Sequence, residues 1–216
     1  VAWGLALQFI IAILVLKTGL RESIFPAASA AVNVLTEATL AGARFVFGKL
    51  PDDQGIGAIF AFQVLPVIVF VSALSAILTH LRIIPVTVGA IAWVMRRTLK
   101  TSGAETFCAA LQIFLGIEAA AAVRTYIKSM TRSELCVIMT TYMGTIAGSV
   151  MVVYSTFGAE AGHLLTASFM TAPAAIVLAK MLVPETEKPV TSGDERIAVP
   201  IESHNIIDAA AQGTAQ

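Results

Sequence analysis

One carboxylate of this chain, that of Glu118, stands in the middle of an apolar segment, residues 101–123. A charge at bilayer depth is costly unless it faces a partner or a water-filled cavity, and such groups usually belong to the path of an ion or a substrate. Glu118 is therefore a candidate binding residue. The alternative is that it pairs with Arg124, six residues further on, or reaches the membrane surface. Glu105, five residues after Lys100, is better explained as a helix cap or an ion-pair partner.

Polar side chains and glycines flank Glu118 at spacings that could line a binding site. Gln112 and Gly116 precede it in the same segment. Hydroxyls and glycines also recur along the next apolar segment, at Thr140, Thr141, Gly144, Thr145, Gly148 and Ser149. Transporters hold ions and substrates with unwound backbone at membrane depth. The glycines and hydroxyls could equally serve helix packing alone, with each hydroxyl bonded to a carbonyl one turn back.

The composition identifies an integral membrane protein. Of the 216 residues, 57% are apolar and 13% are charged, and the mean hydropathy is +0.83. Soluble domains carry about 25% charged residues. The net charge of zero gives no indication of a nucleic-acid partner, and membrane lipid is the expected surrounding. The sequence contains no recognisable nucleophile–base pair or metal-ligand cluster, so neither an enzyme nor a cofactor is expected, and Cys108 and Cys136 are expected to be buried free thiols.

The apolar segments predict an all-α integral membrane protein with about four transmembrane helices, two interfacial helices and one re-entrant helical hairpin. A crossing needs about 20 apolar residues. The predicted crossings are residues 58–78, 135–157 and 164–183, together with the shorter 2–16. Residues 20–47, which we expect to form an interfacial helix with a loop, and residues 83–100 are too polar or too short to cross, so they are predicted to lie in the membrane surface.

Charge asymmetry predicts the hairpin. Residues 101–123 are long enough to cross, but basic residues lie on both sides of them: Arg96, Arg97 and Lys100 before, and Arg124, Lys128 and Arg132 after. Basic clusters prefer the cytoplasmic side. The segment is therefore expected to enter the membrane and return, with its tip at residues 114–118 and its turn at Gly116. From Pro184 onward the chain is polar and rich in proline, which predicts a cytoplasmic linker.

Several motifs in this order resemble the concentrative nucleoside transporter family. They are GARFVFG (42–48), FAFQVLPVIVFVSAL (60–74), TSGAE (101–105), VRTYIKSMTRSEL (123–135), TIAGSV (145–150), LLTASFMTAPAA (164–175), AKMLVPETE (179–187) and NIIDAAAQG (205–213). The resemblance implies a homotrimer in the plasma membrane that carries nucleosides inward on a sodium or proton gradient. It also implies a scaffold part (1–82), a mobile transport part containing the hairpin (83–183), and a linker (184–216) that precedes the missing second half of the protomer.

The same resemblance implies a set of site residues. Nucleoside-binding positions correspond to Glu118, which would contact the base, Ile117 and Val150; sodium positions correspond to Gln112, Leu115, Thr145 and Ile146. Ile117 replaces a Gln-Thr pair of the family, and Gln112 replaces an asparagine. With these changes and without the ribose-binding half, we expect residues 1–216 to insert in a membrane but not to transport alone. The alternative is a non-transporting remnant that retains only membrane assembly.

Overall fold

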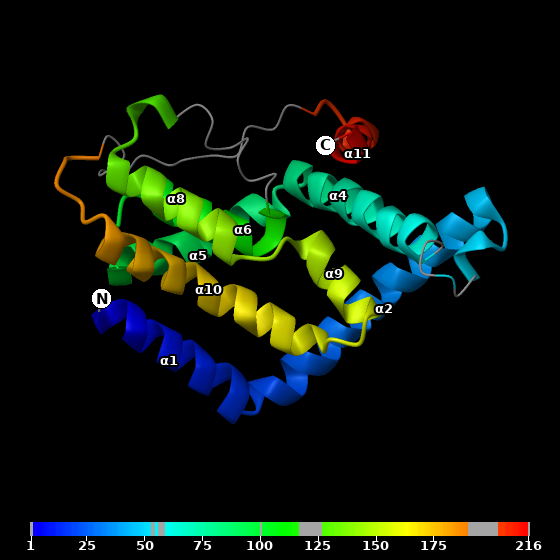
Figure 1. Cartoon of the computed structure of the whole chain (residues 1–216), viewed down its shortest axis with the longest axis horizontal. Helices are drawn as coiled ribbons and strands as arrows, with labels where there is room; N and C mark the ends of the chain where they lie inside the picture. Colours follow the sequence, from blue (N-terminus) through cyan, green and yellow to red (C-terminus); the bar gives the residue numbers. More distant parts are fainter. Residues whose placement is uncertain are drawn as a thin grey trace.

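The computed structural model describes residues 2–52, 55, 59–99, 101–116, 127–189 and 203–215, and regular structure within them is helical throughout. Short helical turns occur at Leu50–Asp52, Phe60–Val64 and Ile127–Ser129. The longer helices, shown in Figure 1, are α1 (Ala2–Lys17), α2 (Leu20–Phe47), α4 (Leu65–His80), α5 (Ile83–Leu99), α6 (Gly103–Leu115), α8 (Arg132–Gly144), α9 (Gly148–Thr156), α10 (Ala161–Leu182) and α11 (Ile206–Ala215). The all-α prediction is confirmed.

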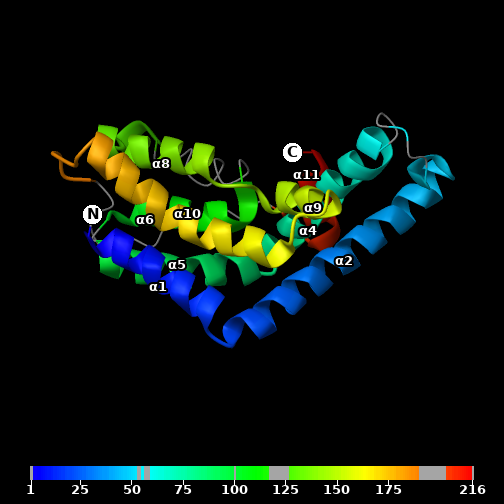
Figure 2. The same ribbon diagram turned by 60° about the horizontal axis from the view of Figure 1, so that its bottom comes forward.

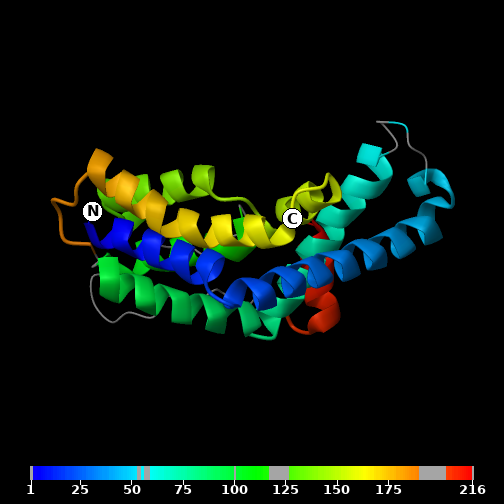
Figure 3. The ribbon, with the colours of Figure 1, turned by 90° about the horizontal axis from the view of Figure 1, so that it is seen from below.

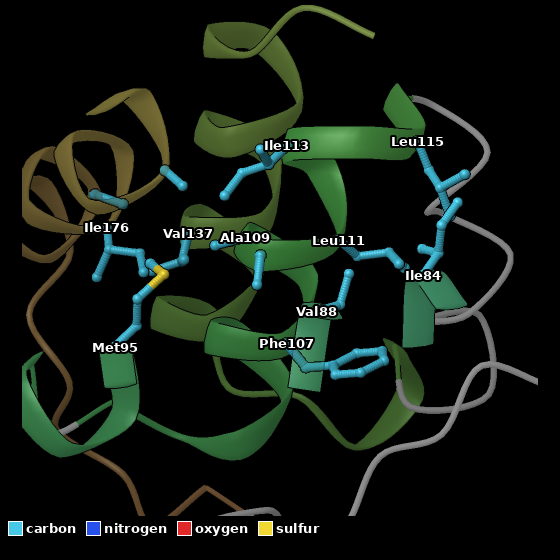
Figure 4. Close-up of a cluster of buried hydrophobic side chains, with 13 residues drawn as sticks. Ile84, Val88, Met95, Phe107, Ala109, Leu111, Ile113, Leu115, Val137 and Ile176 are labelled. Atoms are coloured by element: carbon cyan, nitrogen blue, oxygen red, sulfur yellow. The ribbon is translucent and has the colours of Figure 1, made fainter. Parts of the chain in front are cut away.

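Helix α6 lies at the centre of the larger hydrophobic core, where it packs against α5, α8 and α10. Its residues Ala109, Ala110 and Leu111 have no exposed surface. Figure 4 shows how side chains of α5, such as Val88, and of α10, such as Ile176, surround it. Close packing on every side fixes the position of α6, and with it any side chain that α6 presents to a site.

A second core joins α2, the turn at Phe60–Val64, α4 and α9 through several valines: Val32, Val64, Val67, Val71, Val152 and Val153. Helix α1 packs along α10 and meets α2 at an angle, so the two form a V (Figures 1 and 2). Seen from below, α2 continues far beyond the bundle that contains α1, α5 and α10 (Figure 3). Consecutive helices α8 and α9 thus have their buried residues in different cores.

Within the described part of the chain, four stretches are long and apolar enough to cross a membrane: Arg21–Phe47, Phe60–His80, Arg132–Thr156 and Ala161–Leu182. The last three agree with predicted crossings. The first is α2, which is one continuous helix where the sequence indicated an interfacial helix with a loop; its interfacial placement stays a prediction. The predicted crossing at 2–16 is helical but shorter than the other four.

The predicted crossing at 135–157 consists of two helices rather than one. Helix α8 ends at Gly144, and α9 begins at Gly148. Between them, Thr145 (φ −104°, ψ 153°) and Ala147 (φ −65°, ψ 151°) are extended. Hydropathy could not reveal this break, because the intervening residues are as apolar as a continuous helix requires.

The final residues of the predicted linker at 184–216 form α11. Asn205 Oδ1 accepts a hydrogen bond of 2.8 Å from the Asp208 backbone N–H and caps the helix. Helix α11 packs closely on α4: a Cβ at Gly213 would lie 2.7 Å from the Ser72 carbonyl oxygen. The polar residues before α11 gave no indication that its small residues would pack against α4.

Candidate functional site

Two capping boxes bring the start of α6 and the start of α8 together. Ser102 and Glu105 cap α6, while Thr131 and Glu134 cap α8 in the same reciprocal way. The Ser102 hydroxyl also donates to Glu134 Oε1 at 2.6 Å. The chain therefore leaves this point along α6 and has returned to it by Thr131. This geometry is that of a re-entrant segment, as the charge pattern predicted.

Lys180, near the end of α10, joins the two capping boxes to a third helix. Its ammonium donates to the fully buried Glu105 carboxylate, to Ser133 Oγ at 2.9 Å and to Glu185 Oε2 at 3.4 Å. Both roles expected for Glu105, capping and ion pairing, are confirmed. Partial burial raises the pKa of Glu185, but hydrogen bonds from Thr131 and the Glu187 backbone, with the charge of Lys180, hold that pKa below its ordinary value on balance.

At its other end, α6 meets the break between α8 and α9. Thr145 Oγ1 lies 3.2 Å from Gln112 Oε1. A Cβ at Gly148 would lie 2.9 Å from the Phe114 carbonyl oxygen, so only glycine allows this approach of backbone to backbone. Gly116 (φ +56°) ends α6. Gln112 is ten residues beyond Ser102, a rise of about 15 Å, or about half of a hydrocarbon core of ~30 Å.

Three helix termini converge at this point. The last carbonyls of α6 and α8 lack intrahelical partners, as at any helix C-terminus, and carry partial negative charge. The first N–H groups of α9 have no side-chain cap and carry partial positive charge. Such ends, at membrane depth and shielded by protein, can bind cations at carbonyl oxygens and anionic or polar groups at N–H groups.

Thr145 and Gln112 have more hydrogen-bonding atoms at the break than the described residues pair. Thr145 Oγ1 lies 2.9 Å from the Thr141 carbonyl oxygen and 3.2 Å from Gln112 Oε1, yet a hydroxyl has one proton to donate. The Thr141 contact is the shorter and takes that proton. Gln112 is 1% exposed, and its Nε2 has no partner among the described residues. Gln112 Oε1 and Thr145 Oγ1 thus face each other with lone pairs toward the same space.

The structure brings most of the predicted site residues together. Gln112 and Thr145 are in contact, while Leu115 and Ile146 occupy the adjoining helix end and break. Val150 lies half-buried in the first turn of α9. Residues Ile117 and Glu118 lie outside the described residues.

The sequence analysis did not single out Tyr142, and it considered Gly148 only as one of several glycines that could serve helix packing. The Tyr142 hydroxyl is buried beside the Gln112 side chain. Tyr142 stands in the last turn of α8, three residues before Thr145, which caps the helix. That spacing was the available signal for its position.

A broken helix whose ends meet the end of a re-entrant helix inside a membrane bundle is typical of secondary transporters, which place ion and substrate sites at such points. The fold and the site of this chain therefore resemble those of that class.

Comparisons with known proteins identify the family within that class. A family model described as Nucleoside recognition matches residues 61–161, and models described as the Na+ dependent nucleoside transporter N-terminus and C-terminus match residues 1–50 and 163–216. Solute carrier family 28 member 3 of Homo sapiens is 40% identical over 215 residues, 99% of this chain and 30% of that protein. Sodium/nucleoside cotransporter 1 of Homo sapiens is 38% identical over 218 residues, 100% of this chain and 33% of that protein.

Comparison with solved structures points to the same family. CNTnw in an inward-facing substrate-bound state matches with a TM-score of 0.89 and 37% identity, covering 100% of this chain and 53% of that one. A variant of CNTnw in an outward-facing state matches with a TM-score of 0.85 and 35% identity, covering 99% of this chain and 53% of that one. The chain belongs to the concentrative nucleoside transporter family. It spans about a third of the length of the curated relatives it matches and about half of the solved chains.

Proposed function

We propose that this chain is part of a transporter that takes up nucleosides across the plasma membrane, driven by a sodium or proton gradient and assembled as a homotrimer. The observation that carries this proposal is the contact of the α8–α9 break with the end of α6, through Gln112, Thr145 and Gly148. The relatives named as sodium/nucleoside cotransporters support it.

The residues at the break suit a sodium ion. Gln112 and Thr145 would supply side-chain oxygens, and Leu115 and Ile146 would supply backbone carbonyls. Small hard cations prefer such all-oxygen surroundings. The buried Gln112 Oε1 and the half-buried Thr145 Oγ1 face each other, so a cation between them would be bound by both oxygens. Bound sodium would supply positive charge that stabilises this arrangement and couples uptake to the ion gradient.

The nucleoside is proposed to lie beside the ion site, against the hairpin tip and the start of α9. Glu118 would accept hydrogen bonds from the base, and Val150 would provide an apolar contact. Ile117 cannot hydrogen-bond through its side chain, so Glu118 would dominate base recognition. Removing it leaves little else that could hold the base.

The transport part is proposed to comprise residues 83–183 and the scaffold residues 1–82. Support comes from the larger core, whose buried members all lie on α5, α6, α8 and α10. The network around Lys180 ties three of these helices together at one end. Helix α11 packs on α4 and would move with the scaffold.

The test is Glu118→Gln in the transporter that contains this chain. Uptake of uridine and adenosine should fall at least tenfold, equivalent to about 1.4 kcal/mol. Glu160→Gln, at an exposed position where the carboxylate pairs with His163, is the control and should leave uptake unchanged. Unchanged uptake in Glu118→Gln would instead assign Glu118 to pairing with Arg124.

The half-site proposal has its own test. Vesicles containing residues 1–216 alone should not accumulate uridine or adenosine under sodium or proton gradients. Accumulation would contradict the proposal that this chain is a partial protomer. If the whole transporter assembles in the membrane but never moves nucleosides, the remnant alternative holds.

A further inference from the structure

Two buried polar groups of the described residues lie side by side without a hydrogen-bond partner: the Gln112 Nε2 amide and the Tyr142 hydroxyl. The Tyr142 hydroxyl approaches the Gln112 side chain. The Tyr142 ring is held from α8 against Cys108, which precedes Gln112 by one turn of α6, and against Ile138. Buried tyrosine hydroxyls usually have a partner, so this pair calls for an explanation.

The two ends of the Gln112 amide have different neighbours, and two arrangements satisfy them. In the first, Oε1 faces Thr145 and Nε2 donates to the Tyr142 oxygen. In the second, the amide is turned over: Nε2 donates to Thr145 Oγ1, and the Tyr142 hydroxyl donates to Oε1. A phenol can accept or donate, whereas an aliphatic or phenyl side chain can do neither.

Only the first arrangement suits a cation. It presents Gln112 Oε1 and Thr145 Oγ1 to the same space, because the Thr145 proton goes to the Thr141 carbonyl. The second arrangement presents an N–H group, whose partial positive charge repels a cation. The amide orientation of Gln112 therefore decides whether the site attracts sodium.

We propose that Tyr142 is a positioning residue for the sodium site, which holds the Gln112 amide with its oxygen toward Thr145 when sodium is bound and pairs with the turned amide when sodium is absent. This inference rests on the proposed function, in that it assumes an ion at the α8–α9 break. Tyr142 would not touch the ion itself; it acts through Gln112.

The direction of the effect follows from the bonds each arrangement keeps in Tyr142→Phe. Without the phenol, the sodium-free arrangement retains the Nε2 bond to Thr145 and leaves only the Oε1 acceptor unpaired. A buried N–H group without a partner is rarer in proteins than a carbonyl oxygen without one. The sodium-bound arrangement leaves Nε2 buried without any partner. The substitution therefore penalises the bound state more, and sodium affinity should fall about tenfold, equivalent to about 1.4 kcal/mol.

The experiment measures sodium binding without transport. The thermal unfolding midpoint of the purified transporter containing this chain is titrated with NaCl, with choline chloride keeping the ionic strength constant and no nucleoside present. Tyr142→Phe should shift the half-saturating sodium concentration upward about tenfold. Tyr154→Phe, on α9 with an exposed ring, is the matched control and should not shift it.

A second measurement separates positioning from general packing. Sodium-dependent uptake should show the same shift in half-saturating sodium, while the nucleoside KM at saturating sodium stays unchanged. In a Gln112→Leu background, Tyr142→Phe should have no further effect on sodium, because the amide through which it acts is gone.

Two outcomes would overturn the inference. If Tyr142→Phe binds sodium like the unsubstituted transporter, or weakens it equally in the Gln112→Leu background, Tyr142 only fills space. If the unsubstituted transporter shows no sodium-dependent stabilisation, the proposed sodium site and the role of Tyr142 both fail. The first result leaves the proposed function standing, and the second does not.

Discussion

Lys180→Met removes the lysine of the ion pair at the start of α6 and leaves the buried carboxylate of Glu105 without its counter-charge. Glu105 has no exposed surface, whereas the Lys180 side chain is 23% exposed and has two further oxygen partners, Ser133 and Glu185. Removing one partner of a buried pair costs about 3–5 kcal/mol, because it leaves the other charge uncompensated. The partial exposure of Lys180 places the expected cost for Lys180→Met at about 3 kcal/mol, the lower end of that range.

The reverse change should cost much less. In Glu105→Gln the amide oxygen can still accept from Lys180, whereas the Ser102 N–H loses its acceptor, and the ammonium keeps Ser133, Glu185 and water. We expect a loss of about 1 kcal/mol, the value of one neutral hydrogen bond. The double variant should be more stable than Lys180→Met alone, because no unpaired charge remains buried.

Thermal unfolding of the purified chain in detergent measures these differences. A loss of about 3 kcal/mol corresponds to a fall of about 6–12 °C in Tm for a chain of this size, against about 2–4 °C for Glu105→Gln. Lys188→Met, at an exposed position beyond α10, is the control. Equal losses in the two single variants, or a double variant no better than Lys180→Met, would refute this reasoning about the buried charge.

Three more outcomes are expected. Gly148→Ala should abolish sodium-dependent stabilisation, because its Cβ would meet a backbone carbonyl, whereas Gly89→Ala, which meets nothing within 4 Å, should not; an unaffected Gly148→Ala would contradict the close contact. Cysteines placed at Thr98 and Ser129, on either side of the hairpin, should both be labelled from the cytoplasmic side, and labelling from opposite sides would mean that the segment crosses. Stability contributed by the lowered pKa of Glu185 should be complete above the ordinary pKa of a glutamate and lost as pH falls through the folded value, and Glu185→Gln should remove this acid-range loss in pH-dependent unfolding.

Much of the architecture was predictable because membrane insertion depends on summed local properties. Transfer of apolar side chains into lipid identifies crossings such as α10, and the placement of basic residues indicates that residues 101–123 return. The TSGAE motif likewise contained the capping role of Glu105, because a capping box is a contact between residues three apart.

The site depended on contacts that no local property records. Hydropathy averaged over a window is the same for a continuous helix and for one interrupted at Thr145, so the break became visible only in the backbone. The partner of Gln112 is 33 residues away in sequence, and two partners of Lys180, Glu105 and Ser133, come from two other helices.

The sequence by itself determined that this is a helical membrane protein of a recognisable family with a re-entrant segment, because solvation and charge placement act residue by residue. Only the tertiary structure decided which oxygens face one another at the break, that α11 packs on α4, and that Tyr142 stands beside Gln112. These features arise from close packing between segments far apart in the chain, where a glycine or a hydroxyl matters through its neighbour in space rather than its neighbour in sequence.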